Sequence, residues 1–155
     1  MIRAFRLIKT RHAATAFDGE GAFRFGGRWN HRGTRVAYAS DSVALAVLEV
    51  VVHLGPGAEA YSVVPIEFPE RIVEPFDPAG LPSNWRDDPA PISTRLIGDQ
   101  WAREQRSAVL QVFSAIVPSE RNFVINPLHA DFAYVTIGAP TPFDLDPRIV
   151  RLLPP

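Results

Sequence analysis

Residues 42–54, SVALAVLEVVVHL, constrain the fold of this 155-residue chain more than any other segment. Apart from Ser42, Glu49 and His53, this segment is apolar on every side of a helical wheel, and a helix of that kind is normally buried. The β-branched run at 50–52 makes a strand the competing interpretation for the last turn. We predict a core helix here, because its length is ordinary for one.

Glu49 is the anomaly in this helix. An ionised carboxylate without partners in an apolar setting costs several kcal/mol, and it usually gains a partner or takes up a proton. One interpretation is that Glu49 lies at the helix edge, in solvent or paired with His53 one turn later. The other is that it faces a polar cleft shared with Arg28 and Tyr38. The residue pattern alone leaves both interpretations open.

A glycine-rich turn and a short strand precede this helix. The pair Gly26-Gly27 permits a tight turn and a close approach of the backbone to a ligand, and residues 28–30 are then expected to be extended. Arg28 would thereby come within reach of a site. Residues 36–39 are typical of a short strand, and Tyr38 lies within it.

Composition favours one soluble domain over residues 1–155. Hydrophobic residues make up 46% of the chain and charged residues 21%, as in soluble globular proteins. No apolar run approaches the roughly 20 residues of a membrane span, so we expect a cytoplasmic protein without membrane contact. The chain has no cysteine, and its four histidines are scattered. We therefore expect no metal site and no prosthetic group.

Charge is distributed unevenly along the chain, whose net charge is −1. Residues 1–40 hold seven arginines and Lys9 against two acids, whereas the remainder holds eight arginines against fifteen acids. The small net charge argues against a general nucleic-acid binder. The arginines of the first quarter suit phosphate or carboxylate, because a guanidinium binds such groups in a bidentate way. Either this quarter binds an anionic ligand, or most of its arginines are simply solvated.

The alternation of residues 2–8 predicts a first strand, in which Arg6 has apolar neighbours. Arg6 is then either an edge-strand arginine in solvent or a second anion contact beside Arg28. Within a further strand at 60–68, Pro65 suggests an edge or a bulge. Other expected elements are strands at 71–74, 108–113 and around 148–150, a helix from 93 or 94 to 106, and an irregular excursion from 75 to 91.

Residues 117–129, VPSERNFVINPLH, form the second informative stretch. They place a serine, a glutamate, two asparagines and a histidine around a four-residue strand. Asn122 and Asn126 can each donate and accept hydrogen bonds, which suits a carboxamide or ribose ligand. Asparagines also suit turns, Asn-Pro especially. On spacing alone we interpret both as turn residues.

Several segments taken together resemble the RES domain, the toxin half of a bacterial toxin–antitoxin pair. In order, they are GGRWNHRG, VAYAS, ALAVLE, VVVH, VPSERNFVINPLHADF and PFDLDPRI. This resemblance covers nearly the whole chain. It implies a compact single α+β domain resembling the ADP-ribosyltransferase fold, with small central β-sheets flanked by helices. It also implies an enzyme that consumes NAD+ as its substrate.

The resemblance assigns roles to individual residues of this sequence. The family's arginine in GGRW falls on Arg28, its tyrosine before Ala-Ser on Tyr38, and its glutamate in the Leu-Glu pair on Glu49. These three are the expected catalytic residues. The expected substrate-binding residues are an arginine of the first strand and four polar residues of the two motifs, namely Arg6, Asn30, Ser119, Asn122 and Asn126.

These residue types fit cleavage of the bond between nicotinamide and ribose, by hydrolysis or phosphorolysis. That cleavage develops positive charge at the anomeric carbon, which the carboxylate of Glu49 would stabilise. Arg28 and Arg6 would hold the diphosphate, and Tyr38 would stack on the nicotinamide or the ribose. ADP-ribosyl transfer to a protein is the alternative outcome of the same chemistry.

The resemblance also implies a partner, an antitoxin of the Xre type. This antitoxin would carry a DNA-binding domain and would occlude the active site. Homo-oligomerisation within that complex stays open, and no direct nucleic-acid binding by this chain is expected. Two rival functions of other classes remain. One is an RNA-cleaving toxin with His31 or His53 as its base. The other is a non-catalytic module that binds a dinucleotide.

Overall fold

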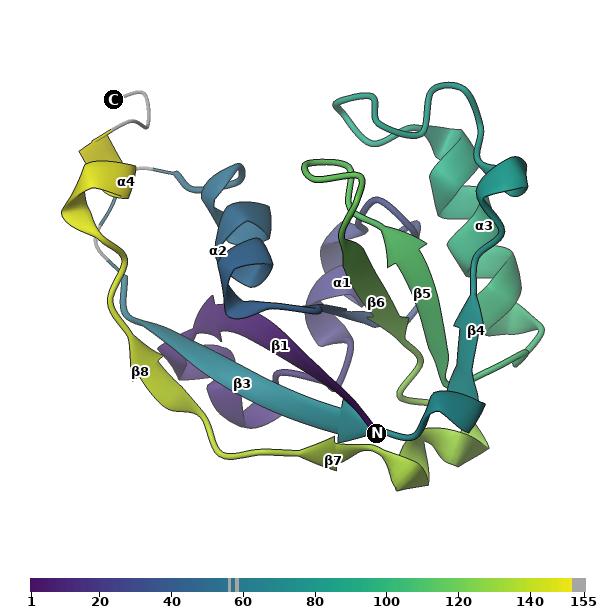
Figure 1. The fold of residues 1–155 in the computed structure, drawn as a ribbon, viewed down its shortest axis with the longest axis horizontal. Helices are drawn as coiled ribbons and strands as arrows, with labels where there is room; N and C mark the ends of the chain where they lie inside the picture. Colours follow the sequence, from purple (N-terminus) through teal and green to yellow (C-terminus); the bar gives the residue numbers. More distant parts are fainter. Residues whose placement is uncertain (56, 58, 152–155) are drawn as a thin grey trace.

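One curled β-sheet joins strands from both ends of the chain in this computed structural model (Figure 1). The structure describes residues 1–55, 57 and 59–151. Within these residues eight strands form the sheet in the order β4-β5-β6-β2-β1-β3-β7, and β8 also pairs with β3. The pairings are antiparallel except that of β4 with β5. The strands are β1 (Ile2–Lys9), β2 (Ala37–Ser40), β3 (Tyr61–Phe68), β4 (Val73–Pro75), β5 (Val109–Phe113), β6 (Arg121–Ile125), β7 (Thr136–Ile137) and β8 (Thr141–Phe143).

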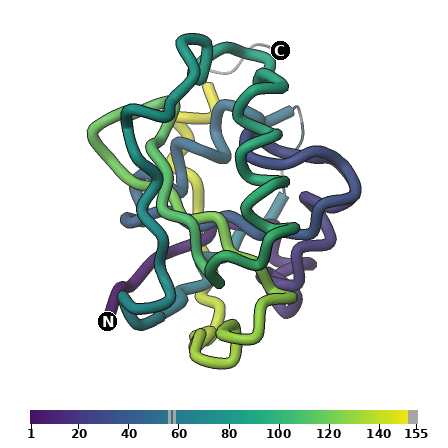
Figure 2. The backbone as a smooth tube through the Cα atoms, turned by 90° about the vertical axis from the view of Figure 1, so that its right-hand side faces the viewer, coloured from purple at the N-terminus to yellow at the C-terminus, as the bar shows by residue number. Residues whose placement is uncertain are grey.

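Helices α2 and α3 cover the same face of this sheet, over different strands. The α-helices are α1 (Glu20–Phe25), α2 (Val43–Val51), α3 (Ile92–Arg103) and α4 (Pro147–Arg151), and the 3-10 turns are Thr10–Thr15, Glu70–Ile72, Pro78–Gly80 and Ala130–Tyr134. Figure 1 shows α2 next to β1 and β3, whereas α3 lies beside β4 and β5, and Figure 2 shows α3 as an upright coil. The predicted α+β class is confirmed, and its strands join in one sheet instead of several small ones.

Three clusters of buried side chains hold these layers together. The cluster beneath α2 contains Leu7, Ala46, Val47, Tyr61 and Val63. The cluster beneath α3 includes Trp29, Val36, Trp101, Leu110 and Val124. A third cluster includes Ala4, Phe17, Ala39, Phe68 and Phe123. The two ends of the sheet therefore each have their own helix and their own apolar contact.

Gly98 brings α3 into direct contact with the turn at residues 26–30. A Cβ atom at this position would overlap the carbonyl oxygen of Trp29. One turn earlier, the hydroxyl of Thr94 donates to the carbonyl of Arg28 at 2.7 Å. The helix and the turn are therefore packed backbone to backbone, and only glycine leaves the space for it.

The predicted helix at 42–54 is present as α2. Ser42 is its N-cap, because its Oγ accepts a hydrogen bond from the backbone N–H of Leu45 at 3.1 Å. Residues 50–51 continue the helix, so the strand interpretation of its last turn is wrong there. Burial is less complete than predicted, since Leu48 and Val52 are 41% and 57% exposed. Only the face toward the sheet is covered.

Pro65 lies within β3, which is continuous and is not at the edge of the sheet. On one side, Pro65 lies opposite Phe5 of β1. On the other side, β7 pairs with Ile66 and Glu67 and β8 pairs with residues 61–63, so Pro65 lies between the two short strands. Its missing N–H is thus not required, and its carbonyl accepts from Gly138 N at 2.8 Å.

The strand predicted around residues 148–150 is wrong, because these residues belong to α4. The Asp146 carboxylate accepts a hydrogen bond from the backbone N–H of Arg148 at 2.8 Å. Pro147 then occupies the first helical position, where its fixed φ and missing N–H are favourable. Ile149 packs against the cluster beneath α2. An Asp-Pro pair that starts a helix outweighed the β-branched residues that follow it.

Candidate active site

Two neutral hydrogen-bond donors hold the carboxylate of Glu49, one directly after β5 and one in β6. Its Oε1 accepts from Ser114 Oγ at 2.8 Å and from Asn122 Nδ2 at 2.6 Å. Within the described residues, no hydrogen bond or ion pair joins Glu49 to His53. The carboxylate is half-buried and points toward the sheet, so it is neither free in solvent nor paired along its own helix.

The register of the sheet explains how these groups meet. Ser40 lies opposite Asn122 across β2 and β6, and Tyr38 lies opposite Val124. Because side chains alternate along a strand, Tyr38 and Ser40 share one face of the sheet. Helix α2 begins shortly after β2 and carries Glu49 over this face. In Figure 1, α2 and the turn between β5 and β6 lie at the same end of the sheet.

Tyr38 has its hydroxyl fully engaged by the glycine-rich turn. The hydroxyl donates to Asn30 Oδ1 at 2.7 Å and accepts from Trp29 N at 3.1 Å. A Cβ at Gly27 would lie 2.7 Å from the Tyr38 hydroxyl, so the turn passes close to the ring. Burial raises the pKa of Tyr38 well above its ordinary value. A neutral, fixed phenol ring therefore lines this part of the site.

Asn30 supports Tyr38 from inside the turn. Its Nδ2 lies within hydrogen-bonding distance of three backbone carbonyls, those of Ala22, His31 and Thr34. The side chain is completely buried. Residues 28–30 form a turn closed by a bridge between Gly27 and Asn30, so the predicted extended segment is wrong. Asn30 acts on the site by fixing Tyr38, because its amide protons already have acceptors.

Arg28 binds the proline-rich excursion at 75–91. Its Nη1 donates to the carbonyls of Trp85 and Asp87, both at 2.9 Å. In the described part of the chain it forms no ion pair or hydrogen bond with Glu49. The shared cleft that the sequence predicted therefore contains no direct contact between the Arg28 guanidinium and the Glu49 carboxylate.

The excursion itself connects the surroundings of Arg28 with those of Glu49. The Trp85 ring packs edge-on against Phe113, with centroids 6.3 Å apart. Arg86 Nε donates to the carbonyl of Ala115 at 2.9 Å, next to Ser114. One loop thus contacts both Arg28 and the strand end that carries Ser114.

Arg6 lies on the face of β1 that is turned away from α2, because the neighbouring Leu7 packs beneath that helix. Its guanidinium lies 5.9 Å from the centroid of the Phe17 ring. Burial lowers the pKa of Arg6 to about 10, and the negative charge of Asp18 opposes this shift. The described residues provide no ion pair or hydrogen bond to its guanidinium. Arg6 is therefore protonated at neutral pH, and its guanidinium has no charged partner within the described residues.

The remaining two predicted residues lie apart from Glu49. The Ser119 side chain is exposed in the turn between β5 and β6, and only its carbonyl is engaged, by Arg121 at 3.1 Å. Asn126 follows the other end of β6, where its Oδ1 accepts from Leu128 N at 3.0 Å. The structure thus brings Glu49 and Asn122 together and places Asn126 at the opposite end of the strand.

A model of the RES domain matches residues 3–146. The chain belongs to the RES domain family. A relative from Yersinia enterocolitica named "Toxin Res" is 36% identical over 148 residues, covering 94% of this chain and 97% of the relative. A relative from Sphingobium sp. named "Prs ADP-ribosylating toxin" is 40% identical over 145 residues, covering 90% of both chains.

The fold of this RES domain is shared with a solved structure. The crystal structure of the M. tuberculosis MbcT-MbcA toxin–antitoxin complex contains a chain that superposes with a TM-score of 0.76. This match covers 97% of the present chain and 87% of that chain, at 20% sequence identity. At this level of identity, the similarity supports a common fold.

Ser114 is a residue of this RES domain site that was not predicted. It is completely buried, and besides donating to Glu49 it accepts from Ile116 N and Val117 N, both at 3.1 Å. The signal was the alternation along β5, because Val112 and Ser114 fall on one face. A serine that continues the buried face of a strand is expected to have a hydrogen-bond partner.

The RES domain contains no cluster of three or more metal-ligating side chains among the residues that the structure describes. None of the helices in that same part is both long and apolar enough to span a bilayer. The polar groups that converge here are a carboxylate, a serine, an asparagine and the neighbouring phenol ring. Such a set can stabilise a positive charge that develops on a substrate.

Proposed function

We propose that this RES domain is the toxin of a toxin–antitoxin pair and that it cleaves the nicotinamide–ribose bond of NAD+. The observation that carries the proposal is the fixed carboxylate of Glu49, which Ser114 and Asn122 hold at the end of the sheet. The relatives named as toxins, one of them as an ADP-ribosylating toxin, support the choice of substrate.

In the proposed reaction, the bond between the anomeric carbon and the nicotinamide nitrogen breaks, and its electron pair leaves with nicotinamide. The oxygen of water or phosphate bonds to the anomeric carbon, and a proton is released to solvent when water attacks. Glu49 stabilises the oxocarbenium character between these events. No metal or redox cofactor takes part in this balance, since NAD+ is consumed as substrate.

The surrounding residues would bind and orient the dinucleotide. Arg6 has an unengaged guanidinium for the diphosphate, and Arg28 would exchange its two carbonyl partners for phosphate oxygens. Tyr38 would offer its ring face, because its hydroxyl is already bonded to Asn30 and Trp29. Asn122 serves chiefly to hold Glu49, whereas the exposed Ser119 is available to contact the sugar.

Replacement of Glu49 by glutamine tests this function. Glu49→Gln keeps the side-chain shape and an acceptor for Ser114 and Asn122, so the fold should persist while nicotinamide release from NAD+ falls by at least about a hundredfold. Glu70→Gln, on an exposed 3-10 turn, is the matched control and should retain full turnover. Equal nicotinamide release by Glu49→Gln and the parent would refute the proposal.

ADP-ribosyl transfer to a protein is the second candidate, favoured by the name of the Sphingobium relative. Incubation with biotin-labelled NAD+ and a cell lysate would distinguish the two outcomes. Label on a discrete protein band, with little nicotinamide released in the absence of lysate, would favour transfer. Rapid nicotinamide release by the purified domain alone would favour hydrolysis or phosphorolysis.

We further propose an antitoxin partner that covers the Glu49 site and carries an Xre-type DNA-binding domain. The structural similarity to a chain of a toxin–antitoxin complex supports such a partner. An NAD+-consuming domain that its partner keeps in check would act in the cytoplasm. Co-expression with the product of the neighbouring gene should restore cellular NAD+ and should yield a stable complex, whose size would report any homo-oligomer within it.

A further inference from the structure

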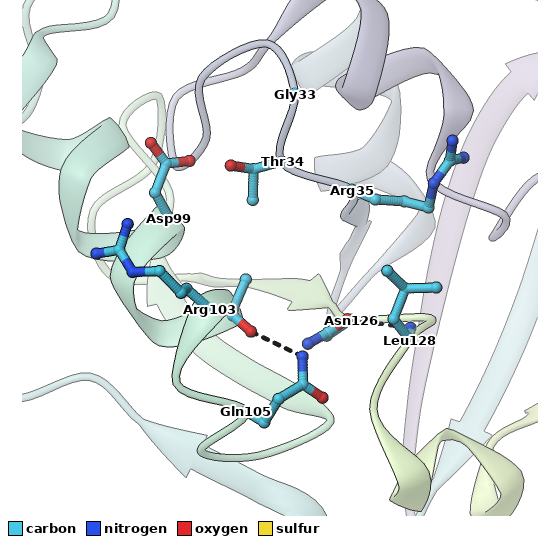
Figure 3. A pocket seen from close by; sticks show the side chains of 9 residues that line it. Gly33, Thr34, Arg35, Asp99, Arg103, Gln105, Asn126 and Leu128 are labelled. Carbon is cyan, nitrogen blue, oxygen red and sulfur yellow. Dashed lines mark hydrogen bonds between the residues drawn. The ribbon is translucent and has the colours of Figure 1, made fainter.

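A second pocket lies at the opposite end of β6 from Glu49. Its volume is about 340 Å³, which is near the lower end for small-molecule sites. Three segments form it, namely the loop at 33–35, the C-terminal half of α3 with the residues that follow it, and the stretch at 126–128 (Figure 3). Asn122 belongs to the Glu49 site and Asn126 to this pocket, so β6 separates the two.

Asn126 leaves one hydrogen-bond donor unused in the wall of this pocket. Its side chain is only 1% exposed, and its Nδ2 has no acceptor among the residues that the structure describes. The amide orientation is fixed, because Oδ1 accepts from Leu128 N at 3.0 Å and a rotated amide would lose that bond. A buried donor without a partner is energetically unfavourable. An acceptor atom that reaches Nδ2 from the pocket would recover this cost.

The charges around the pocket leave a cation available and no free anion. Arg103 forms no hydrogen bond or ion pair within the described chain. Asp99 has both oxygens engaged by His31, one by its backbone N–H at 2.9 Å and one by Nδ1 at 2.6 Å. Arg35 points away from the pocket in Figure 3 and pairs with Glu20 at 2.8 Å. The unused polar groups are therefore mainly donors.

Gln105 controls access to the Asn126 amide. It adopts a left-handed backbone conformation, with φ at 52°, directly after the helix. In Figure 3 its side chain lies next to Asn126, and its Nε2 donates to the carbonyl of Ala102 at 2.8 Å. The residue is otherwise exposed. A ligand would therefore displace one exposed side chain that is held by a single side-chain hydrogen bond.

We propose that this pocket binds a small molecule bearing an oxyanion, a carboxylate or a phosphate, independently of the Glu49 site. Asn126 Nδ2 donates to one oxygen of the anion, and the Arg103 guanidinium binds the charge. The other side of the ligand lies against Thr34 and Leu128.

Titration of the isotope-labelled protein, followed by amide NMR at constant ionic strength, tests this site with inorganic phosphate in one series and succinate in the other. Saturable shifts are expected for the side-chain amides of Asn126 and Gln105 in at least one series, and the tighter probe identifies the anion. Arg103→Gln should weaken that binding by about tenfold. Arg148→Gln removes the same charge from α4 and should leave it unchanged.

Asn126→Asp supplies the second variant. It retains the acceptor for Leu128 N, but it replaces the free donor by a negative charge, so saturable binding should disappear. The proposal fails if neither anion gives saturable shifts at Asn126, which would mean that the pocket holds only water. It also fails if Arg103→Gln and Arg148→Gln bind the anion equally well.

Discussion

Asn122 and Glu49 are joined by a hydrogen bond of 2.6 Å between the asparagine Nδ2 and the carboxylate Oε1. Asn122 Oδ1 in turn accepts from Ser40 Oγ at 2.7 Å, which fixes the orientation of the amide. The amide thus presents an N–H to the carboxylate, and the register of β2 and β6 determines where Glu49 can point.

Asn122→Asp should make NAD+ turnover depend on pH in a new way. At low pH the two carboxyl groups share a proton, and a protonated aspartic acid donates to Glu49 as the amide does. Once both groups are ionised at higher pH they repel one another, so turnover should fall relative to that of the parent. Parallel pH–rate profiles of variant and parent would contradict the assigned contact.

Ser114→Ala should reduce both stability and turnover. Two backbone N–H groups, those of Ile116 and Val117, lose their acceptor, and we expect a loss of about 1–3 kcal/mol in the free energy of unfolding. Glu49 also loses a donor, so turnover should fall by at least about tenfold. Ser119→Ala should change stability by less than about 0.5 kcal/mol, because that side chain is exposed. Urea unfolding and NAD+ assays compare the two serines, and a larger loss of turnover at Ser119 would reverse their roles.

Arg28→Gln should release the excursion and weaken dinucleotide binding. The parent guanidinium holds two loop carbonyls, so its loss should speed trypsin cleavage after Arg86. Affinity for NAD+ in the Glu49→Gln background, measured by titration calorimetry, should fall by about tenfold. Arg32→Gln is the control, because Arg32 is exposed and lies on the same loop as Arg28. Unchanged affinity together with faster cleavage would assign Arg28 to the loop alone.

Arg6→Met should raise the melting temperature while lowering affinity for NAD+. Folding lowers the pKa of Arg6 from its ordinary value to about 10, so the folded state disfavours the cation. This destabilisation is fully present at neutral pH, and it is relieved only as the pH rises through about 10. Thermal unfolding at pH 7 should therefore favour the variant, whereas the diphosphate loses a cation. A variant that is less stable than the parent would show that Arg6 stabilises the fold.

The sequence pattern predicted the central elements and the anomalous carboxylate. Helix α2 was evident from its apolar run and Glu49 from its place within it, because charge is costly in such a setting. Tyr38 lies in β2 as predicted. The partners of Glu49 could not be deduced, since they depend on the register between β2 and β6, which links residues some eighty positions apart.

Other parts of the site depend on contacts that a single sequence does not specify. Trp85 and Asp87 bind Arg28 through their carbonyls, so their side chains give no signal of the contact. Asn122 and Asn126 gave the same signal in the sequence. They belong to two sites because Asn122 lies near the start of β6 and Asn126 follows its end. The C-terminal segment is a helix and not the predicted strand, because Asp146 and Pro147 start a helix that Ile149 and Val150 continue.

The absence of a side chain at position 98 has a mechanical consequence. With no free space between the backbone of α3 and the Trp29 carbonyl, neither segment can slide past the other. Any displacement of α3, one wall of the second pocket, must also displace Arg28 and with it the excursion near Ser114. A movement at the second pocket would thus be transmitted toward the Glu49 site through the backbone contact at Gly98.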